Sequence, residues 1–209
     1  MNHIVLLGDS IFDNAAYVAS GPDVVRQLRE ILPAGWRATL NALDGAVVAD
    51  VPQQLKELPR DATHLVLSIG GNDALGDADL LERKVASMAE ALELITQVRE
   101  RFRSAYARML DRVLQPKLPL AVCTIYEPRF PEPAIRRVAA TALTALNDAI
   151  TREAFARKVD CIDLRIICDD DRDFANPIEP SVQGGAKIAR AILGFTALPP
   201  ERLPRVITR

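Results

Sequence analysis

Short apolar runs alternate along the chain with longer stretches in which apolar residues recur every three or four positions. The runs are rich in Val, Ile and Leu and predict strands, whereas the longer stretches predict amphipathic helices. Strands are expected at residues 4–7, 37–43, 64–69, 120–125 and 159–164. Strands that alternate with helices, and are apolar throughout, are typical of a parallel sheet buried on both faces. We therefore predict a three-layer α/β/α domain with a five-stranded, flavodoxin-like parallel sheet.

Helices are expected at residues 23–31, 47–58, 79–114, 133–157 and 181–193, with Pro133 in a first turn and Ser181 as an N-cap. The third carries a stripe of apolar residues that we expect to face the core: Leu81, Val85, Met88, Leu92, Ile95, Phe102, Tyr106, Met109 and Val113. Unbroken, it would be on the order of 50 Å long. We expect either a bend near Arg99 or a protruding end that meets a partner chain, which leaves a homodimer open.

The residues after the last expected helix are rich in proline. Pro199, Pro200 and Pro204 prevent the helix from continuing, so this tail is expected to be an extended arm. We assign residues 1–195 to the domain and residues 196–209 to a C-terminal extension.

Composition narrows the classes of function. Apolar residues make up 49% of the chain and charged residues 26%. The formal net charge is −2, and this charge gives no electrostatic case for nucleic acid or an anionic membrane as partner. No apolar stretch of about 20 residues and no leader are apparent. The three cysteines, Cys123, Cys161 and Cys168, lack metal-like spacing and are expected to be reduced and buried. A cytoplasmic protein is expected.

Polar residues that could bind a ligand or take part in catalysis follow four of the expected strands. They are Gly8-Asp9-Ser10, Asp44-Gly45, Gly70-Gly71-Asn72-Asp73 and Tyr126-Glu127-Pro128-Arg129. In an open parallel sheet, ligands bind outside the carboxyl ends of the strands. These groups are therefore expected to meet in one cleft.

The first three groups resemble, in order and spacing, the conserved blocks of the SGNH, or GDSL-type, hydrolase superfamily. That resemblance implies that Ser10 is a nucleophile and that a small ester or acylated molecule is the substrate. It also implies an oxyanion hole formed by the N–H groups of Ser10 and Gly45 and the side-chain amide of Asn72. Taken singly, these residues are also consistent with helix caps and turns. Their occurrence together at three successive strand ends favours a catalytic cleft.

The last block of the family departs from the usual pattern. It normally contains Asp-x-x-His, but here Asn176 stands in place of the aspartate and Glu179 in place of the histidine. The only histidines, His3 and His64, are at the amino ends of strands, across the sheet from Ser10. No histidine-dependent triad can be built from this chain.

Three explanations remain open. Glu179 itself is the base, as a glutamate is in the unrelated serine-carboxyl peptidases, with a pKa raised by the apolar residues around it. Alternatively, hydrolysis is weak or lost, and the protein binds a small molecule or acyl group. In the third explanation an acid such as Asp13 or Asp173 serves instead, with Asn176 orienting it.

Further residues are expected around the substrate. Asp9 and Asn176 adjoin the predicted catalytic positions. Tyr126 and Phe12 are expected either to supply apolar walls or to belong to the core. Arg129 would bind a substrate carboxylate or pair with Glu127 or Glu179. The acidic run at residues 169–173 lacks the calcium-loop pattern and is expected to be a solvated loop. No metal and no cofactor are predicted.

Overall fold

One parallel sheet organises the protein. The computed structural model describes the chain apart from residues 1, 20, 197–203 and 209. The strands are β1 (Asn2–Gly8), β2 (Trp36–Leu40), β3 (His64–Ser68), β4 (Leu120–Cys123), β5 (Asp160–Ile162) and β6 (Val206–Ile207). Their order is β2-β1-β3-β4-β5-β6 and every pair is parallel. The predicted α/β fold is confirmed, with one strand more than the five expected.

The additional strand, β6, comes from the predicted C-terminal extension. It pairs with the outer edge of β5, where the N–H of Cys161 donates to the carbonyl of Arg205 at 2.8 Å. The Arg205 side chain also binds Asp160, with 2.5 Å between Nη2 and Oδ2. These contacts satisfy backbone groups on an edge that would otherwise be unpaired. The remainder of the predicted arm, residues 197–203, lies outside the described part of the chain.

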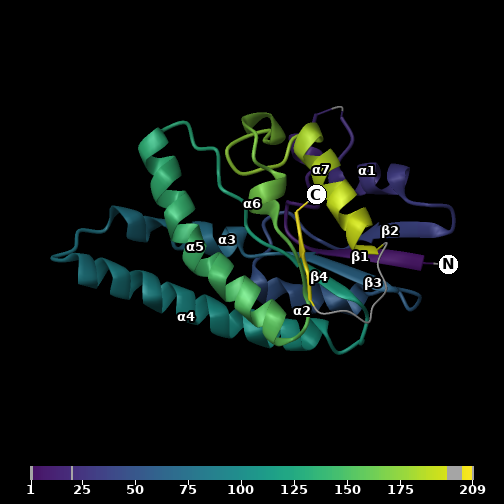
Figure 1. Ribbon diagram of the computed structural model, residues 1–209, viewed down its shortest axis with the longest axis horizontal. Helices are drawn as coiled ribbons and strands as arrows, with labels where there is room; N and C mark the ends of the chain where they lie inside the picture. Colours follow the sequence, from purple (N-terminus) through teal and green to yellow (C-terminus); the bar gives the residue numbers. More distant parts are fainter. Residues whose placement is uncertain (1, 20, 197–203, 209) are drawn as a thin grey trace.

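Helices cover both faces of the sheet (Figure 1). They are α1 (Val24–Ile31), α2 (Val51–Gln54), α3 (Gly71–Gly76), α4 (Met88–Val113), α5 (Pro133–Ala156), α6 (Leu164–Ile167) and α7 (Val182–Thr196), with short 3₁₀ turns at η1 (Ala15–Tyr17), η2 (Val48–Asp50), η3 (Leu55–Glu57), η4 (Ala78–Glu82) and η5 (Asp171–Asp173). Side chains of β1 alternate between two apolar clusters. Ile4 and Leu6 belong to the cluster that includes residues of α1 and α7, and Val5 and Leu7 to the one with residues of α2, α4 and α5.

The long third helix begins later than expected and has no bend near Arg99, but it has the protruding end that was predicted as the alternative to a bend (Figure 1). It begins at Met88, where the Oγ of Ser87 accepts the N–H of Glu90 at 3.1 Å, and it continues through Arg99 without a break. The apolar face of its C-terminal half is buried, but Met88 is 76% exposed and Leu92 is 57% exposed. The prediction of a core-facing stripe over the whole segment was therefore wrong for its N-terminal half, which projects beyond the sheet (Figure 1).

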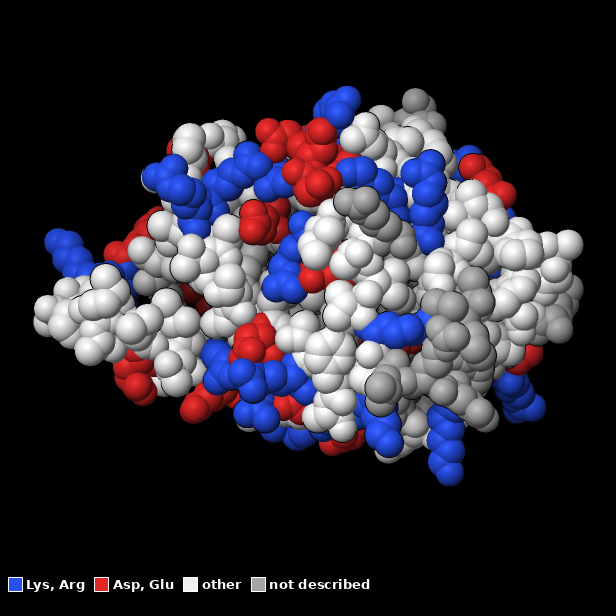
Figure 2. Space-filling model, viewed as in Figure 1, with Lys and Arg blue, Asp and Glu red and all other residues white. Residues whose placement is uncertain are grey.

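The surface and the cysteines agree with the composition. Charged side chains of both signs are interspersed over the face shown in Figure 2. Cys123, Cys161 and Cys168 are buried free thiols. Among the described residues, no helix has the length and apolar character needed to cross a membrane.

Candidate active site

The turn after β1 has a backbone that only glycine accommodates well. Gly8 has a φ of +125°, and a Cβ on it would lie 1.7 Å from the carbonyl oxygen of Ser68. The side chain of Gln54 binds both polar groups of Gly8, accepting its N–H at 2.8 Å and donating to its carbonyl at 2.7 Å. These contacts hold the backbone that leads into Ser10. Gln54 was not predicted as part of the site, because a glutamine within an expected helix carries no sequence signal for this contact.

Ser10 meets Glu179 across 169 residues of sequence. Ser10 Oγ donates a hydrogen bond to Glu179 Oε1 at 2.9 Å, and the two residues are only 6% and 5% exposed. Asn176 shapes the turn that carries Glu179, because its Oδ1 accepts the N–H groups of Ile178 and Glu179, each at 2.9 Å. The two positions at which the chain departs from the family pattern thus act on one turn, and that turn brings a carboxylate to the serine.

The surroundings of Glu179 favour its protonated form. Burial raises the pKa of Glu179 to about 7, the hydrogen bond from Ser10 opposes the increase, and the negative charge of Asp44 adds to it. Among the described residues, Glu179 Oε2 has no hydrogen-bond partner. A carboxylate with this pKa has a basicity close to that of an ordinary imidazole.

The predicted oxyanion donors lie on neighbouring segments. Asn72 Nδ2 donates to the carbonyl of Ala46 at 2.9 Å, and its second N–H remains available because an amide has two. Gly45 adopts a φ of +79°. Within the described part of the chain, the N–H groups of Ser10 and Gly45 donate to no backbone or side-chain acceptor. Their role in binding an oxyanion stays a prediction.

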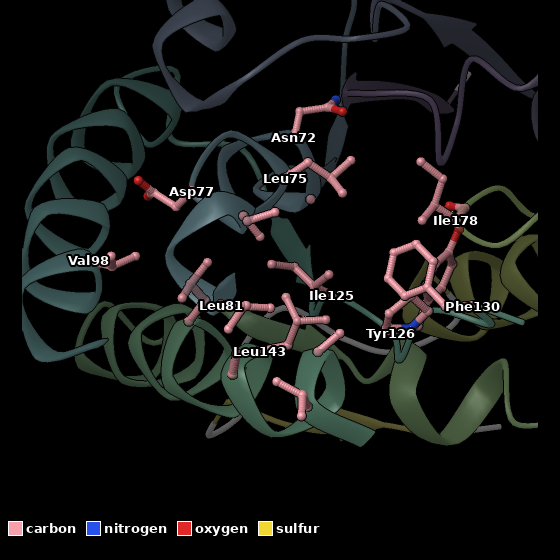
Figure 3. A pocket seen from close by; sticks show the side chains of 18 of the residues that line it. Asn72, Leu75, Asp77, Leu81, Val98, Ile125, Tyr126, Phe130, Leu143 and Ile178 are labelled. Atoms are coloured by element: carbon pink, nitrogen blue, oxygen red, sulfur yellow. Dashed lines mark hydrogen bonds between the residues drawn. The ribbon is translucent and has the colours of Figure 1, made fainter. Parts of the chain in front are cut away.

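A cavity of about 470 Å³ opens beside Ser10 (Figure 3). Its lining includes Asp9, Ser10, Asn72, Tyr126 and Glu179, together with many apolar side chains from α3, η4, α4 and α5. The size is within the range of roughly 300–1,000 Å³ usual for small-molecule sites. The apolar part of this lining was not anticipated from the sequence.

Three of the predicted site residues lie outside the cavity lining. These are Gly45, Asn176 and Arg129. Arg129 binds the loop that carries Glu179: its Nη2 donates to the carbonyl of Asp169 at 2.9 Å, and its Nε lies 3.1 Å from Asp171 Oδ1. Arg129 therefore supports this loop, and its ion pairs are with Asp171 and, at 3.9 Å, with Glu127, one of the partners expected. Its binding of a substrate carboxylate stays a prediction.

The aromatic residues divide between two roles. The Tyr126 hydroxyl donates to the carbonyl of Ile178 at 2.6 Å while its ring lines the cavity, as Figure 3 shows. Phe12 is fully buried and does not line the cavity, so of the two roles expected for it the core position is the one observed. Its burial follows from its place beneath the turn that holds Ser10, against the α1 and α7 layer.

The histidines and the other acids have partners elsewhere. His3 contacts Thr39 at 2.7 Å and Asp61 at 3.2 Å, at the amino edge of the sheet as predicted. Asp13 accepts the N–H of Asp44 at 3.0 Å, and Asp173 binds Lys187 at 2.7 Å. Neither Asp13 nor Asp173 lines the cavity, which leaves Glu179 as the acid that hydrogen-bonds to Ser10.

The acidic run at residues 169–173 pairs with basic side chains. Besides Asp173, Asp169 contacts Lys187 at 3.1 Å, Asp170 contacts Arg172 at 2.8 Å, and Asp171 contacts Arg136 at 2.9 Å. In the described residues, no group of three or more His, Cys, Asp or Glu side chains is arranged to hold a metal ion. The run is a loop stabilised by ion pairs.

Asp9 is a second buried carboxyl group in the cavity. Its Oδ1 accepts the N–H of Ile11 at 3.2 Å, and burial raises the pKa of Asp9 to about 8, with smaller contributions in the same direction from Glu179 and Asp73. An unfolded aspartate titrates near pH 3.9. The folded protein therefore retains a proton that the unfolded chain releases, and the contribution of Asp9 to stability decreases as the pH rises from about 4 to about 8.

Asp9→Asn should weaken this pH dependence. The amide retains an acceptor for Ile11 and carries no charge to desolvate, so we expect the variant to be more stable than the wild type at pH 9, by about 2 kcal/mol or roughly 4–8 °C in Tm. At pH 5 most of this advantage should be lost, because the unfolded aspartate releases its proton only above about pH 4. Thermal unfolding from pH 4.5 to pH 9 measures it, with the exposed Asp79→Asn as the control. Parallel pH profiles for Asp9→Asn and wild type would contradict this account.

Comparison with known proteins agrees with the geometry. The sequence model of the GDSL-like Lipase/Acylhydrolase family matches residues 6–186, and the chain belongs to this family. An extracellular lipase from Streptomyces rimosus has 18% identity and a TM-score of 0.66, covering 94% of this chain and 99% of its own. A carbohydrate acetylesterase from Sinorhizobium meliloti has 13% identity and the same TM-score, with the same coverage. No curated protein matches the chain by sequence. At these identities the solved structures establish the fold.

Proposed function

We propose that this protein is a serine ester hydrolase in which Ser10 is the nucleophile and Glu179 is the general base. The observation that carries the proposal is the buried hydrogen bond of 2.9 Å from Ser10 Oγ to Glu179 Oε1. A base within hydrogen-bond reach of a nucleophile is the geometry that covalent catalysis requires. Membership of a family of lipases and acylhydrolases supports the reaction class.

The proposed reaction has two stages. Ser10 Oγ attacks the ester carbonyl carbon while its proton passes to Glu179, and the resulting oxyanion is bound by the N–H groups of Ser10 and Gly45 and the amide of Asn72. Collapse of this tetrahedral intermediate breaks the bond to the alcohol. The alcohol takes the proton from Glu179 as it departs, and acyl-Ser10 remains. Water then attacks the acyl group and gives a proton to Glu179, and Ser10 regains this proton as the carboxylic acid departs. Each oxyanion donor is worth roughly 3–4 kcal/mol in comparable sites.

The pKa of Glu179 matches this task. A general base is most effective when its pKa lies near the working pH. With a pKa of about 7, Glu179 is substantially ionised at neutral pH and still basic enough to share the serine proton. An ordinary glutamate, near 4.3, would be a weaker base.

A binding protein without turnover is the second candidate. Two observations favour it: Glu179 Oε2 has no partner in the described residues, so no third group orients the carboxylate as in a triad, and the Ser10 hydroxyl is almost wholly buried. Such a protein would hold an ester or acyl group beside Ser10 without cleaving it.

Covalent labelling separates the two candidates. We expect a fluorophosphonate probe to label the wild type at Ser10 and to fail on Ser10→Ala, whereas Ser104→Ala, an exposed serine on α4, should label normally. A short-chain aryl ester should be hydrolysed by the wild type and not by Ser10→Ala. A wild type that neither labels nor turns over between pH 4 and pH 9 would exclude the hydrolase and support the binding protein.

A further inference from the structure

The cavity beside Ser10 extends into an apolar arm. From the Ser10 end, where Asn72, Tyr126 and Ile178 lie, the lining continues between η4, α4 and α5 through Leu75, Leu81, Val98, Val138 and Leu143. Figure 3 shows Leu81, Val98 and Leu143 on one side of this space and Tyr126, Phe130 and Ile178 on the other. The arm is formed where the N-terminal halves of α4 and α5 pass beyond the sheet.

Several side chains of the arm are apolar and yet remain in contact with solvent. Leu81, Ile135 and Val138 are 44%, 49% and 50% exposed, and all three line the cavity. The charged Asp77 in the lining is paired with Arg101 at 2.7 Å and 2.8 Å. Uncharged surface, white in Figure 2, predominates at the end of the molecule where η4 and the start of α4 lie. A hydrocarbon ligand would remove this apolar surface from water, which is favourable.

The direction of the arm indicates which part of an ester it receives. In the proposed reaction the alcohol leaves by taking a proton from Glu179, so the alcohol must lie within reach of Glu179. The acyl group then extends away from Glu179, past α3 and towards the arm between η4, α4 and α5. We infer, resting on the proposed function, that the substrates are esters of unbranched fatty acids whose hydrocarbon chain occupies this apolar arm.

The size of the arm sets a rough chain length. Lining residues on α5 extend from Ala134 to Leu146, a rise of about 18 Å at 1.5 Å per residue. An extended chain of tetrahedral carbons with bonds near 1.5 Å advances about 1.25 Å per carbon. Since part of this length flanks the reacting carbonyl, acyl chains on the order of ten carbons fit.

Hydrolysis of two ester series tests the inference. With p-nitrophenyl esters from acetyl to hexadecanoyl, kcat/KM should increase by up to about fourfold per methylene until roughly ten carbons and then level off. With alkyl acetates, lengthening the alcohol should have little effect. Ala142→Phe, which places a ring in the arm, should abolish the increase of kcat/KM with acyl length. Ala89→Phe, the same exchange at an exposed position of α4, is the matched control.

Binding to Ser10→Ala separates failure of this inference from failure of the proposed function. We expect that variant to bind dodecanoate, measured by displacement of a fluorescent fatty acid, and the double variant with Ala142→Phe to bind at least tenfold more weakly. Chain-dependent binding in a protein that never hydrolyses esters would support the apolar arm and refute the hydrolase. Any one of three results would overturn the inference. These are hydrolysis of short esters without binding of dodecanoate, a kcat/KM that does not change along the acyl series, and a preference for long alcohols.

Discussion

Glu179→Gln is expected to lower kcat/KM for an aryl ester by about 10³-fold, within the range found for loss of a general base. Glutamine has the shape of glutamate, and its carbonyl oxygen can still accept the hydrogen bond that Ser10 donates at 2.9 Å. It cannot take the serine proton. The loss would therefore report on proton transfer with the geometry of the site retained.

The pH profile makes this prediction specific to the base. Burial raises the pKa of Glu179 to about 7, so wild-type kcat/KM should fall about tenfold per unit below pH 7 and level off above it. This decrease below pH 7 is the acidic limb of the profile. In Glu179→Gln the limb should be absent. Glu127→Gln, an exposed carboxylate on the loop after β4, should retain both the rate and the limb. If Glu179→Gln keeps the limb near pH 7, another group is the base.

Glu179→His tests the oxyanion hole in the same background. An imidazole at this position restores the residue type usual in the family and has a basicity close to that of Glu179. Activity equal to or above that of the wild type would show that the oxyanion donors are in place and serve either base. Activity as low as that of Glu179→Ala would show that the turn held by Asn176 does not present a histidine correctly to Ser10.

Gly8→Ala should be the most destabilising single exchange in the site region, by more than about 4 kcal/mol. The added Cβ would lie 1.7 Å from the carbonyl oxygen of Ser68, a backbone atom of the adjacent strand that cannot move without breaking the sheet. The φ of +125° adds strain for any residue with a Cβ. Urea unfolding followed by circular dichroism measures the loss, which would appear as a much lower midpoint or an unfolded protein.

Gly35→Ala is the matched control for that exchange. Gly35 has a φ of +83°, but nothing lies within 4 Å of a Cβ placed there. We expect it to cost only about 1 kcal/mol, the penalty of the backbone conformation alone. Equal losses in Gly8→Ala and Gly35→Ala would mean that contact with Ser68 is unimportant and that the turn after β1 relaxes.

The similar structures include proteins described as a lipase and as an acetylesterase at the same TM-score of 0.66. In this chain, the parts that surround the arm beside Ser10 are η4 and the N-terminal halves of α4 and α5, which lie outside the sheet (Figure 1). Acyl selectivity is therefore expected to respond to changes there and not to changes in the strands.

The sequence alone determined the sheet and the candidate chemistry, because both depend on local patterns. Apolar runs such as that of β1 are buried on both faces, and the polar residues after them, Ser10 and Asn72 among them, lie at the cavity. The resemblance to the GDSL-type family also placed Glu179 at the position where that family usually has a histidine.

Only the tertiary structure decided which groups meet. The contact between Ser10 and Glu179 joins residues 169 positions apart, and the basicity of Glu179 depends on burial that several segments create together. Periodicity likewise marks Leu81 and Ile95 as apolar positions on a helical face, but it cannot distinguish a face packed on a sheet from one beside an open cleft. That distinction depends on where the sheet ends, and so the apolar arm beside Ser10 emerged only from the fold.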